Sequence, residues 1–271
     1  MGAVNQQQRE QWNDENQATL WPKRERITTC VTRPLLDLLG LQPGERVLEI
    51  GSGGGLAAIE AANAVAPSGE VVGFDLSAPL ANLATKRAAE AGVPNVRFVV
   101  GDAQVDDIPG APFDAVISQF GVMFFADPVA AFANIRRHLR PGGRIAFACW
   151  QSADDNPWFP GPILGRYMPP PPPNPGGAPP PGPFAFADTN HVQHVLERAG
   201  FDDVARAPFT TDVAVPEDSM FDRETLDARI DEDKREQAWR DLQQLAASMR
   251  RSDGQLELHL AVHFVRARNP H

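Results

Sequence analysis

The stretch Glu49-Ile-Gly51-Ser-Gly53-Gly-Gly55 follows an apolar run and precedes an alanine-rich segment. Glycines let the backbone turn tightly, and they let a ligand approach without the hindrance of a Cβ atom. The helix that starts after such a turn offers free N–H groups and the positive end of its dipole to an anionic group. This strand–turn–helix pattern predicts a ligand-binding crevice at the carboxyl end of a strand.

Short apolar runs alternate with helical stretches on both sides of this turn. The runs are Arg46–Ile50, Glu70–Phe74, Val96–Val100, Phe113–Ile117 and Arg144–Ala148, and the helical stretches between them are 56–65, 79–91 and 128–139. Near-continuous apolar strands separated by helices are typical of a parallel sheet covered on both faces. We therefore predict an α/β fold in which Ser77 and Asp127 begin helices as N-caps.

The remaining segments are assigned to the same domain, which we expect to span residues 1–271. We predict an N-terminal flap or helix over 1–27, a core over 28–150, a proline-rich loop over 151–187, and C-terminal helices with a β-hairpin over 188–271. Of the 26 prolines, 13 lie between Pro157 and Pro183. Such a segment favours a polyproline-type loop, which is either a stiff spacer or a wall of the substrate pocket.

Composition excludes several classes of partner. The chain has 25 Lys and Arg against 35 Asp and Glu, for a net charge of −10, and it contains no basic run that would neutralise nucleic-acid phosphates. No apolar run is long enough to span a membrane, and the N-terminus lacks the apolar stretch of a signal peptide. The two cysteines, Cys30 and Cys149, are isolated. We expect a cytoplasmic protein with no metal site.

Two carboxylates follow neighbouring strands and complete the predicted crevice. Asp75 ends the second strand, where an ionised carboxylate suits the two O–H donors of a ribose. Asp102, in Gly101-Asp102-Ala103, ends the third strand and can accept from an adenine amine. The turn lacks the Gly-Lys-Ser/Thr ending of a phosphate-binding P-loop, and Leu56 departs from the dinucleotide fingerprint. A nucleoside with an extension toward the glycine turn fits this pattern.

Taken together, these residues resemble a class I S-adenosylmethionine (SAM)-dependent methyltransferase. Within that class, the segment Gly182-Pro-Phe-Ala-Phe-Ala-Asp188 is similar to the bacterial group related to ubiquinone and menaquinone methyltransferases. The resemblance implies a Rossmann-like sheet of seven strands, mostly parallel, with helices on both faces and an antiparallel last strand. It also implies SAM as cofactor and a small molecule as methyl acceptor.

The resemblance further implies roles for individual residues. Gly51, Ser52 and Gly53 would face the methionine part of SAM, and Glu49 would attract its positively charged end. Asp75 would hold the ribose hydroxyls. Leu76 would pack against adenine, whose edge Asp102 and Ala103 would contact. Ser118, Gln119 and Phe120, which follow the fourth strand, would lie near the transferred methyl group.

Aromatic and apolar side chains beyond the strand ends predict an apolar acceptor pocket. The candidates are Trp12, Trp21, Met123, Phe124, Trp150 and Trp158. His191 and His194 are weak candidates for a general base, and no catalytic residue is otherwise identified. The function expected is in-line methyl transfer to a small apolar or aromatic metabolite. Two alternatives stay open, namely a SAM-binding partner protein without catalysis and a Rossmann oxidoreductase, and the chain can be a monomer or a homodimer.

Overall fold

The computed structural model describes residues 5–14, 16–168, 179–227 and 230–270. A single seven-stranded sheet runs through it in the order β3-β2-β1-β4-β5-β7-β6. The strands are β1 (Arg46–Ile50), β2 (Glu70–Asp75), β3 (Val96–Val100), β4 (Phe113–Gln119), β5 (Leu139–Trp150), β6 (Asp202–Val215) and β7 (Leu256–Arg268). β1 to β5 are parallel, whereas β7 pairs antiparallel with both β5 and β6. The predicted fold class is confirmed.

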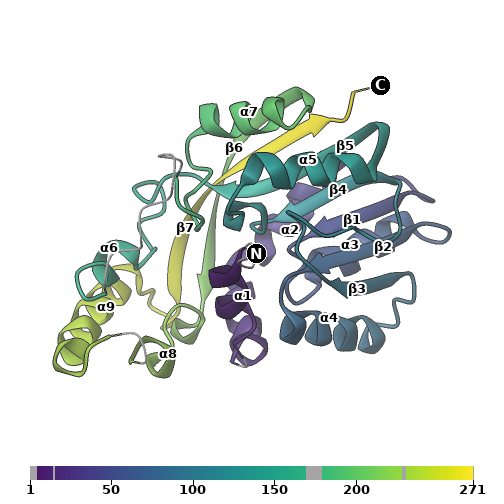
Figure 1. The fold of residues 1–271 in the computed structure, drawn as a ribbon. Coiled ribbons are helices and arrows are strands. Elements are labelled where there is room, and N and C mark those ends of the chain that lie inside the picture. Colours follow the sequence, from purple (N-terminus) through teal and green to yellow (C-terminus); the bar gives the residue numbers. More distant parts are fainter. Residues whose placement is uncertain (1–4, 15, 169–178, 228–229, 271) are drawn as a thin grey trace.

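Helices cover both faces of the sheet (Figure 1). On one face lie α2 (Gln17–Leu39), α3 (Leu56–Val65) and α4 (Ala78–Glu90), and on the other lie α5 (Pro128–His138) and α7 (Thr189–Arg198). Alanines at 57, 58, 61 and 62 are buried on the inner side of α3, and their small size lets this helix approach the strands closely. The predicted caps are present, since Ser77 Oγ accepts from the Leu80 N–H and Asp127 Oδ1 from the Ala130 N–H.

Two parts of the chain differ from the predicted bounds. α2 begins at Gln17, so it crosses the predicted boundary between the N-terminal segment 1–27 and the core, and it continues through Pro22 and Pro34. β5 begins at Leu139 rather than at Arg144, with an irregular register opposite β4. The predicted C-terminal helices include α8 (Arg223–Asp227) and α9 (Arg235–Met249). Three helices, α8, α9 and α6 (Gly161–Leu164), lie together beyond the ends of β6 and β7 (Figure 1).

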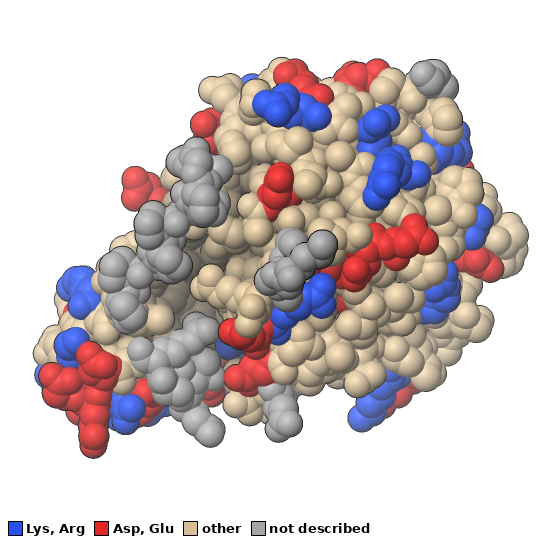
Figure 2. Space-filling view, in the orientation of Figure 1, with Lys and Arg blue, Asp and Glu red and all other residues tan. Residues whose placement is uncertain are grey.

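The surface drawn in Figure 2 carries its charges in small separate groups. Lys and Arg side chains lie there among Asp and Glu side chains. Among the residues that the structure describes, none of the helices combines the length and apolar character of a membrane span.

The short helix α1 (Gln6–Trp12) lies across the carboxyl edge of the sheet (Figure 1). Below it, the chain leaving β1 and the chain leaving β4 come into direct backbone contact. A Cβ atom on Gly51 would lie 2.8 Å from Gly121 Cα, and one on Gly121 would lie 2.7 Å from the Ile50 carbonyl oxygen. Real Cβ atoms do not tolerate such distances, so this crossing depends on two glycines.

Substituting Gly51 tests the crossing, with Gly92 as a matched control. Both glycines have a positive φ, +67° and +66°, but a Cβ on Gly92 would meet nothing within 4 Å. Gly92→Ala should cost about 1–2 kcal/mol of unfolding free energy, the cost of the left-handed backbone. Gly51→Ala should cost a further ~1–3 kcal/mol from overpacking. Urea unfolding measures both, and equal losses would contradict a close contact at Gly51.

Candidate functional site

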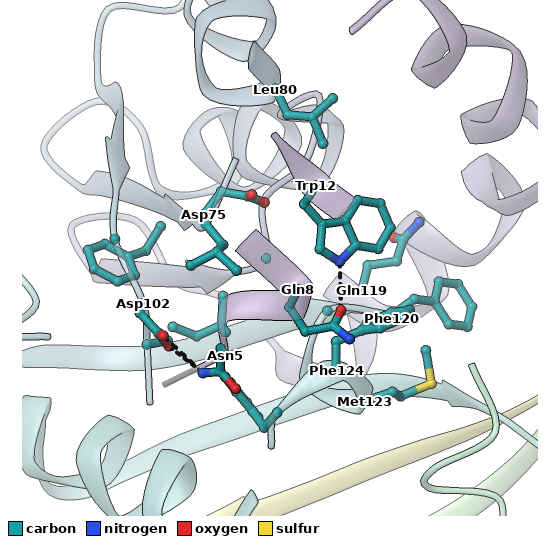
Figure 3. Close-up of a pocket in the computed structure, with 18 of the residues that line it drawn as sticks. Asn5, Gln8, Trp12, Asp75, Leu80, Asp102, Gln119, Phe120, Met123 and Phe124 are labelled. Atoms are coloured by element: carbon teal, nitrogen blue, oxygen red, sulfur yellow. Dashed lines mark hydrogen bonds between the residues drawn. The ribbon is translucent and has the colours of Figure 1, made fainter. Parts of the chain in front are cut away.

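Two adjoining cavities open at the carboxyl edge of the sheet, one of about 220 Å³ and one of about 150 Å³. Figure 3 shows residues that line the larger cavity. The larger cavity lies among the ends of β2, β3 and β4 and under α1, and the smaller cavity lies between the glycine turn and α2. Both are lined by Trp21, Gly51, Gln119, Phe120 and Trp150. The two cavities therefore form one elongated site that bends around the glycine turn.

Trp21 of α2 lies directly on the glycine turn. A Cβ atom at Gly53 or Gly54 would collide with its indole ring. The indole N–H donates to Glu25 (3.0 Å), whose other carboxylate oxygen accepts from Arg87 of α4 (2.8 Å). These hydrogen bonds among the partly buried side chains of Trp21, Glu25 and Arg87 hold α2 against the glycine turn.

Asp75 occupies the centre of the site. It is 9% exposed, and it accepts hydrogen bonds from the N–H groups of Gly53 (2.7 Å) and Ser77 (2.8 Å). Burial raises the pKa of Asp75, and these two hydrogen bonds oppose that rise. An ionised carboxylate can accept about four hydrogen bonds, so it retains capacity toward the larger cavity.

Asp102 lies at the other end of the larger cavity and is held by α1 (Figure 3). Its carboxylate accepts from Asn5 Nδ2 (2.9 and 3.0 Å), from Arg9 (3.2 Å) and from the Gln104 N–H (3.0 Å). Leu76 and Ala103 line the cavity between Asp75 and Asp102. The structure thus brings the predicted nucleoside residues together along one wall.

Three buried polar atoms in the smaller cavity have no hydrogen-bond partner among the residues that the structure describes. They are Glu49 Oε2, Ser52 Oγ and Gln119 Oε1, and all three residues line that cavity. Gln119 donates its Nε2 hydrogen to the Thr28 carbonyl oxygen (3.0 Å), which orients its own oxygen away from that bond. Burial, with added repulsion from Asp75, raises the pKa of Glu49 well above its usual range. A buried polar group without a partner is unfavourable, so this arrangement suits a ligand that would satisfy it.

Aromatic side chains form the opposite wall. Phe120 stacks on Trp150 with ring centroids 4.2 Å apart and planes at 14°, and Trp12 meets Phe124 edge to face at 5.3 Å. Phe120 has φ +62°, a strained conformation for a bulky residue, and this backbone turn directs its ring into the site. Met123, Phe125 and Pro183 complete this wall.

Hydrogen bonds from several residues hold α1 against the core. Asn13 donates to the Leu76 carbonyl oxygen (3.1 Å) and accepts from the Ala78 N–H (2.9 Å), while Ser77 Oγ donates to the Trp12 carbonyl oxygen (2.6 Å). Gln8 and Trp12 share one face of α1, and with the N-cap residue Asn5 they line the larger cavity. α1 is therefore one wall of the site, as the predicted N-terminal flap would be.

Several predicted residues lie outside the two cavities. Ser118 is fully buried, and its Oγ donates to the Ile50 carbonyl oxygen (2.7 Å), which ties β4 to β1. Trp158 packs behind Trp150 at 5.3 Å. His191 and His194 belong to α7, away from both linings, and His191 lies edge to face with Phe186 at 6.0 Å.

The structure adds residues that the sequence analysis did not single out. Asn5, Gln8, Arg24, Glu25, Thr28, Phe125 and Pro183 all line the site. The i, i+3, i+7 spacing of Asn5, Gln8 and Trp12 is the signal that could have placed the first two on one helix face. Within the described residues, no group of three or more His, Cys, Asp or Glu side chains is arranged to hold a metal ion.

The strand order, the glycine turn and the carboxylates after β2 and β3 define a class I SAM-dependent methyltransferase domain. Residues 47–143, from within β1 to the start of β5, match the family described as a methyltransferase domain.

Two curated relatives and one solved structure illustrate the similarity. Aklanonic acid methyltransferase DauC from Streptomyces sp. (strain C5) is 39% identical over 119 residues, which are 44% of this chain and 54% of the relative. Demethylmenaquinone methyltransferase from Beutenbergia cavernae is 34% identical over 137 residues, 50% of this chain and 52% of the relative. The chain thus spans about half the length of these relatives. A SAM-dependent methyltransferase from Aquifex aeolicus has the same fold, with a TM-score of 0.52, 16% identity and 88% coverage of both chains.

The buried carboxyl group of Glu49 makes a prediction about stability. The pKa of Glu49 is higher in the folded protein than in the unfolded chain. The ligand-free folded protein therefore loses stability as the pH rises from the pKa of the unfolded chain through that of the folded protein. Glu49→Gln removes that loss, so the ligand-free variant should be more stable than the parent by on the order of 1–3 kcal/mol at pH 8. Below about pH 4 the difference should vanish, because Glu49 is then neutral in both states.

Urea unfolding at several pH values measures this difference. Glu70→Gln, at the exposed start of β2, is the matched control and should change little at any pH. A Glu49→Gln variant that is less stable than the parent at pH 8 would show that the carboxylate is satisfied in the folded protein.

Proposed function

We propose that this chain transfers a methyl group from SAM to a small apolar or aromatic metabolite. The observation that carries the proposal is the set of three unpartnered polar atoms on Glu49, Ser52 and Gln119 in the smaller cavity. Two of them are acceptors that require a donor, and the third is a hydroxyl that can donate or accept. An amino-acid end with one ammonium and one carboxylate group satisfies this mixture.

The methionine end of SAM has this chemistry. Its ammonium group carries three N–H donors and a positive charge, which suit Glu49 Oε2 and Gln119 Oε1. An ammonium beside Glu49 would also lower the pKa of that carboxyl and remove its penalty for ionisation. Ser52 Oγ can donate to the methionine carboxylate. We assign Gly51, which lines both cavities, and Gly53, which lies under the Trp21 ring outside both linings, to the backbone beside the methionine part.

The larger cavity suits the adenosine end. We assign Asp75 to the ribose hydroxyls, which would use the acceptor capacity that Gly53 and Ser77 leave free. Leu76 would pack on the adenine ring. Asp102 would accept from the adenine amine, and Ala103 would contact the ring edge. Because Asn5 and Arg9 bond to the same Asp102 carboxylate, α1 would lie against the bound adenine.

When bound, SAM supplies a methyl group already activated by its sulfonium, so the chain has to align an acceptor rather than carry out difficult bond chemistry. Gln119 and Phe120 lie where the two cavities meet, and we assign them to the surroundings of the methyl group. The stacked rings of Phe120 and Trp150 would exclude water there and direct the acceptor into line with the sulfonium.

Apolar rings dominate the side of the larger cavity that remains for the acceptor. Trp12, Met123 and Phe124 line it, and Trp21 and Trp150 border it. Pro183 also lines it, and the Gly182 N–H donates to the Met123 carbonyl oxygen (3.1 Å). These contacts favour the pocket-wall interpretation of the proline-rich loop over the spacer interpretation, although residues 169–178 lie outside the described part of the chain. The curated relatives act, by name, on aklanonic acid and on demethylmenaquinone, both small molecules.

We further propose that residues 1–271 act as one domain in the cytoplasm, with a small molecule rather than a nucleic acid as partner. The oxidoreductase alternative is not favoured, because the matched family is a methyltransferase family. A SAM-binding protein without catalysis would bind the cofactor but form no S-adenosylhomocysteine (SAH). Incubation with SAM and a panel of aromatic hydroxyl and enol acceptors separates this alternative, since only an enzyme will release SAH in proportion to methylated product.

Calorimetric titration with SAH tests the assigned cofactor residues. Glu49→Gln and Asp75→Asn should each weaken SAH binding by about 1–3 kcal/mol, or roughly 5- to 150-fold, because each removes a charge-assisted contact. Glu70→Gln should leave SAH affinity unchanged, since its side chain is exposed and lies outside both cavity linings. Failure of the folded parent protein to bind SAH would overturn the proposed function, whereas unchanged affinity in both site variants would overturn the residue assignments.

A further inference from the structure

Gln8 is a buried polar residue in an otherwise apolar part of the larger cavity. It is 8% exposed and lies on the inner face of α1, four residues before Trp12. Its neighbours across the cavity are Phe120 and Phe124 (Figure 3). The cofactor roles proposed above do not use it.

The hydrogen bond between Gln8 and Trp12 orients the Gln8 amide. Trp12 Nε1 lies 3.1 Å from Gln8 Oε1, and an indole nitrogen can only donate. The atom facing it must therefore be the amide oxygen, which leaves the NH₂ group on the other side. The Trp12 ring packs between Phe124 and Trp21, with ring centroids 5.3 and 6.3 Å away. This packing fixes the position of the indole N–H that donates to Gln8.

The Gln8 NH₂ group has two N–H donors, and no residue that the structure describes accepts from them. In Figure 3 the amide nitrogen points toward Phe120 and Phe124, away from Asp75 and Asp102. The donors are thus directed at the acceptor side of the cavity rather than at the predicted ribose and adenine contacts. Because Gln8 lines the larger cavity, a bound molecule with an accepting oxygen on that side would form a hydrogen bond with these donors.

We propose that Gln8 is an acceptor-positioning residue and that its Nε2 donates a hydrogen bond to an oxygen atom of the methyl acceptor. This proposal rests on the proposed function and narrows its substrate class. The acceptor is a planar ring compound that carries a carbonyl or ionised hydroxyl oxygen on its body. The aromatic wall binds its faces, while Gln8 fixes its rotation within the plane and so selects the atom that meets the methyl group.

A pair of probes tests the Gln8 donor directly. 9-Fluorenone and fluorene have the same planar three-ring body, and only fluorenone has a carbonyl oxygen. Their binding is measured by the quenching of tryptophan emission, both with saturating SAH and without it. The parent protein should bind fluorenone about tenfold more tightly than fluorene, the effect of one hydrogen bond to a buried donor.

Gln8→Glu is the informative variant, because it is isosteric and keeps an oxygen acceptor for the Trp12 N–H while it removes the NH₂ donors. It should abolish the preference for fluorenone. Gln7→Glu makes the same chemical change at the neighbouring exposed position and should retain the full preference. Gln8→Met, which removes the donor without adding charge, should also lose the preference, and thermal unfolding shows that each variant is folded.

The outcomes separate this proposal from the proposed function. Equal binding of the two probes by the parent, an unchanged preference in Gln8→Glu and Gln8→Met, or no binding of either probe would each overturn the role of Gln8. Failure to bind SAH is a different result and overturns the proposed function. Because the probe ratio is also measured without SAH, it shows whether Gln8 donates to a bound carbonyl oxygen even when SAH does not bind.

Discussion

The close approach of two backbone segments, at Gly51 after β1 and at Gly121 after β4, is the constraint on which the site depends. β1 and β4 are adjacent parallel strands with Glu49 opposite Ile117, so their carboxyl ends reach the same edge of the sheet. Ser118 reinforces the crossing through its hydrogen bond to the Ile50 carbonyl oxygen. A side chain at either glycine would collide with the opposite backbone segment and force the two segments apart.

This crossing also determines what faces the ligand. It brings Glu49 from β1 and Gln119 from β4 to one cavity, and it leaves Phe120 in a left-handed conformation stacked on Trp150. The result is costly in the ligand-free protein, because three polar atoms are buried without partners and the pKa of Glu49 is raised. Such costs are typical of functional sites, where the ligand supplies the missing interactions.

Much of this arrangement follows from local sequence signals. The β-branched runs predict β1 to β4 well, since near-continuous apolar strands need both faces covered, and the turn residues Ser77 and Asp127 predict the helix starts. The glycine turn, Asp75 and Asp102 could be assigned to one edge because parallel strands share the direction of their carboxyl ends. Gln119 and Phe120 line the site for the same reason.

Other features depend on contacts between distant segments and have no local signal. Gln8 lies in a polar, glutamine-rich helix, and it lines the cavity because long-range hydrogen bonds, such as those from Asn5 to Asp102 and from Asn13 to Leu76, hold that helix against the core. Trp158 is of a residue type that often lines pockets, but its side chain packs behind Trp150.

Comparison of two ligands tests most directly whether the smaller cavity binds the amino-acid end of the cofactor, as we propose. SAH and 5′-methylthioadenosine share adenosine and a thioether sulfur, but only SAH has the ammonium and carboxylate groups. Calorimetry should show that SAH binds at least about 100-fold more tightly, since two charge-assisted interactions of ~1.5–3 kcal/mol each are involved. Equal affinities would contradict the account, because the polar atoms of Glu49, Ser52 and Gln119 would then not contact the ligand.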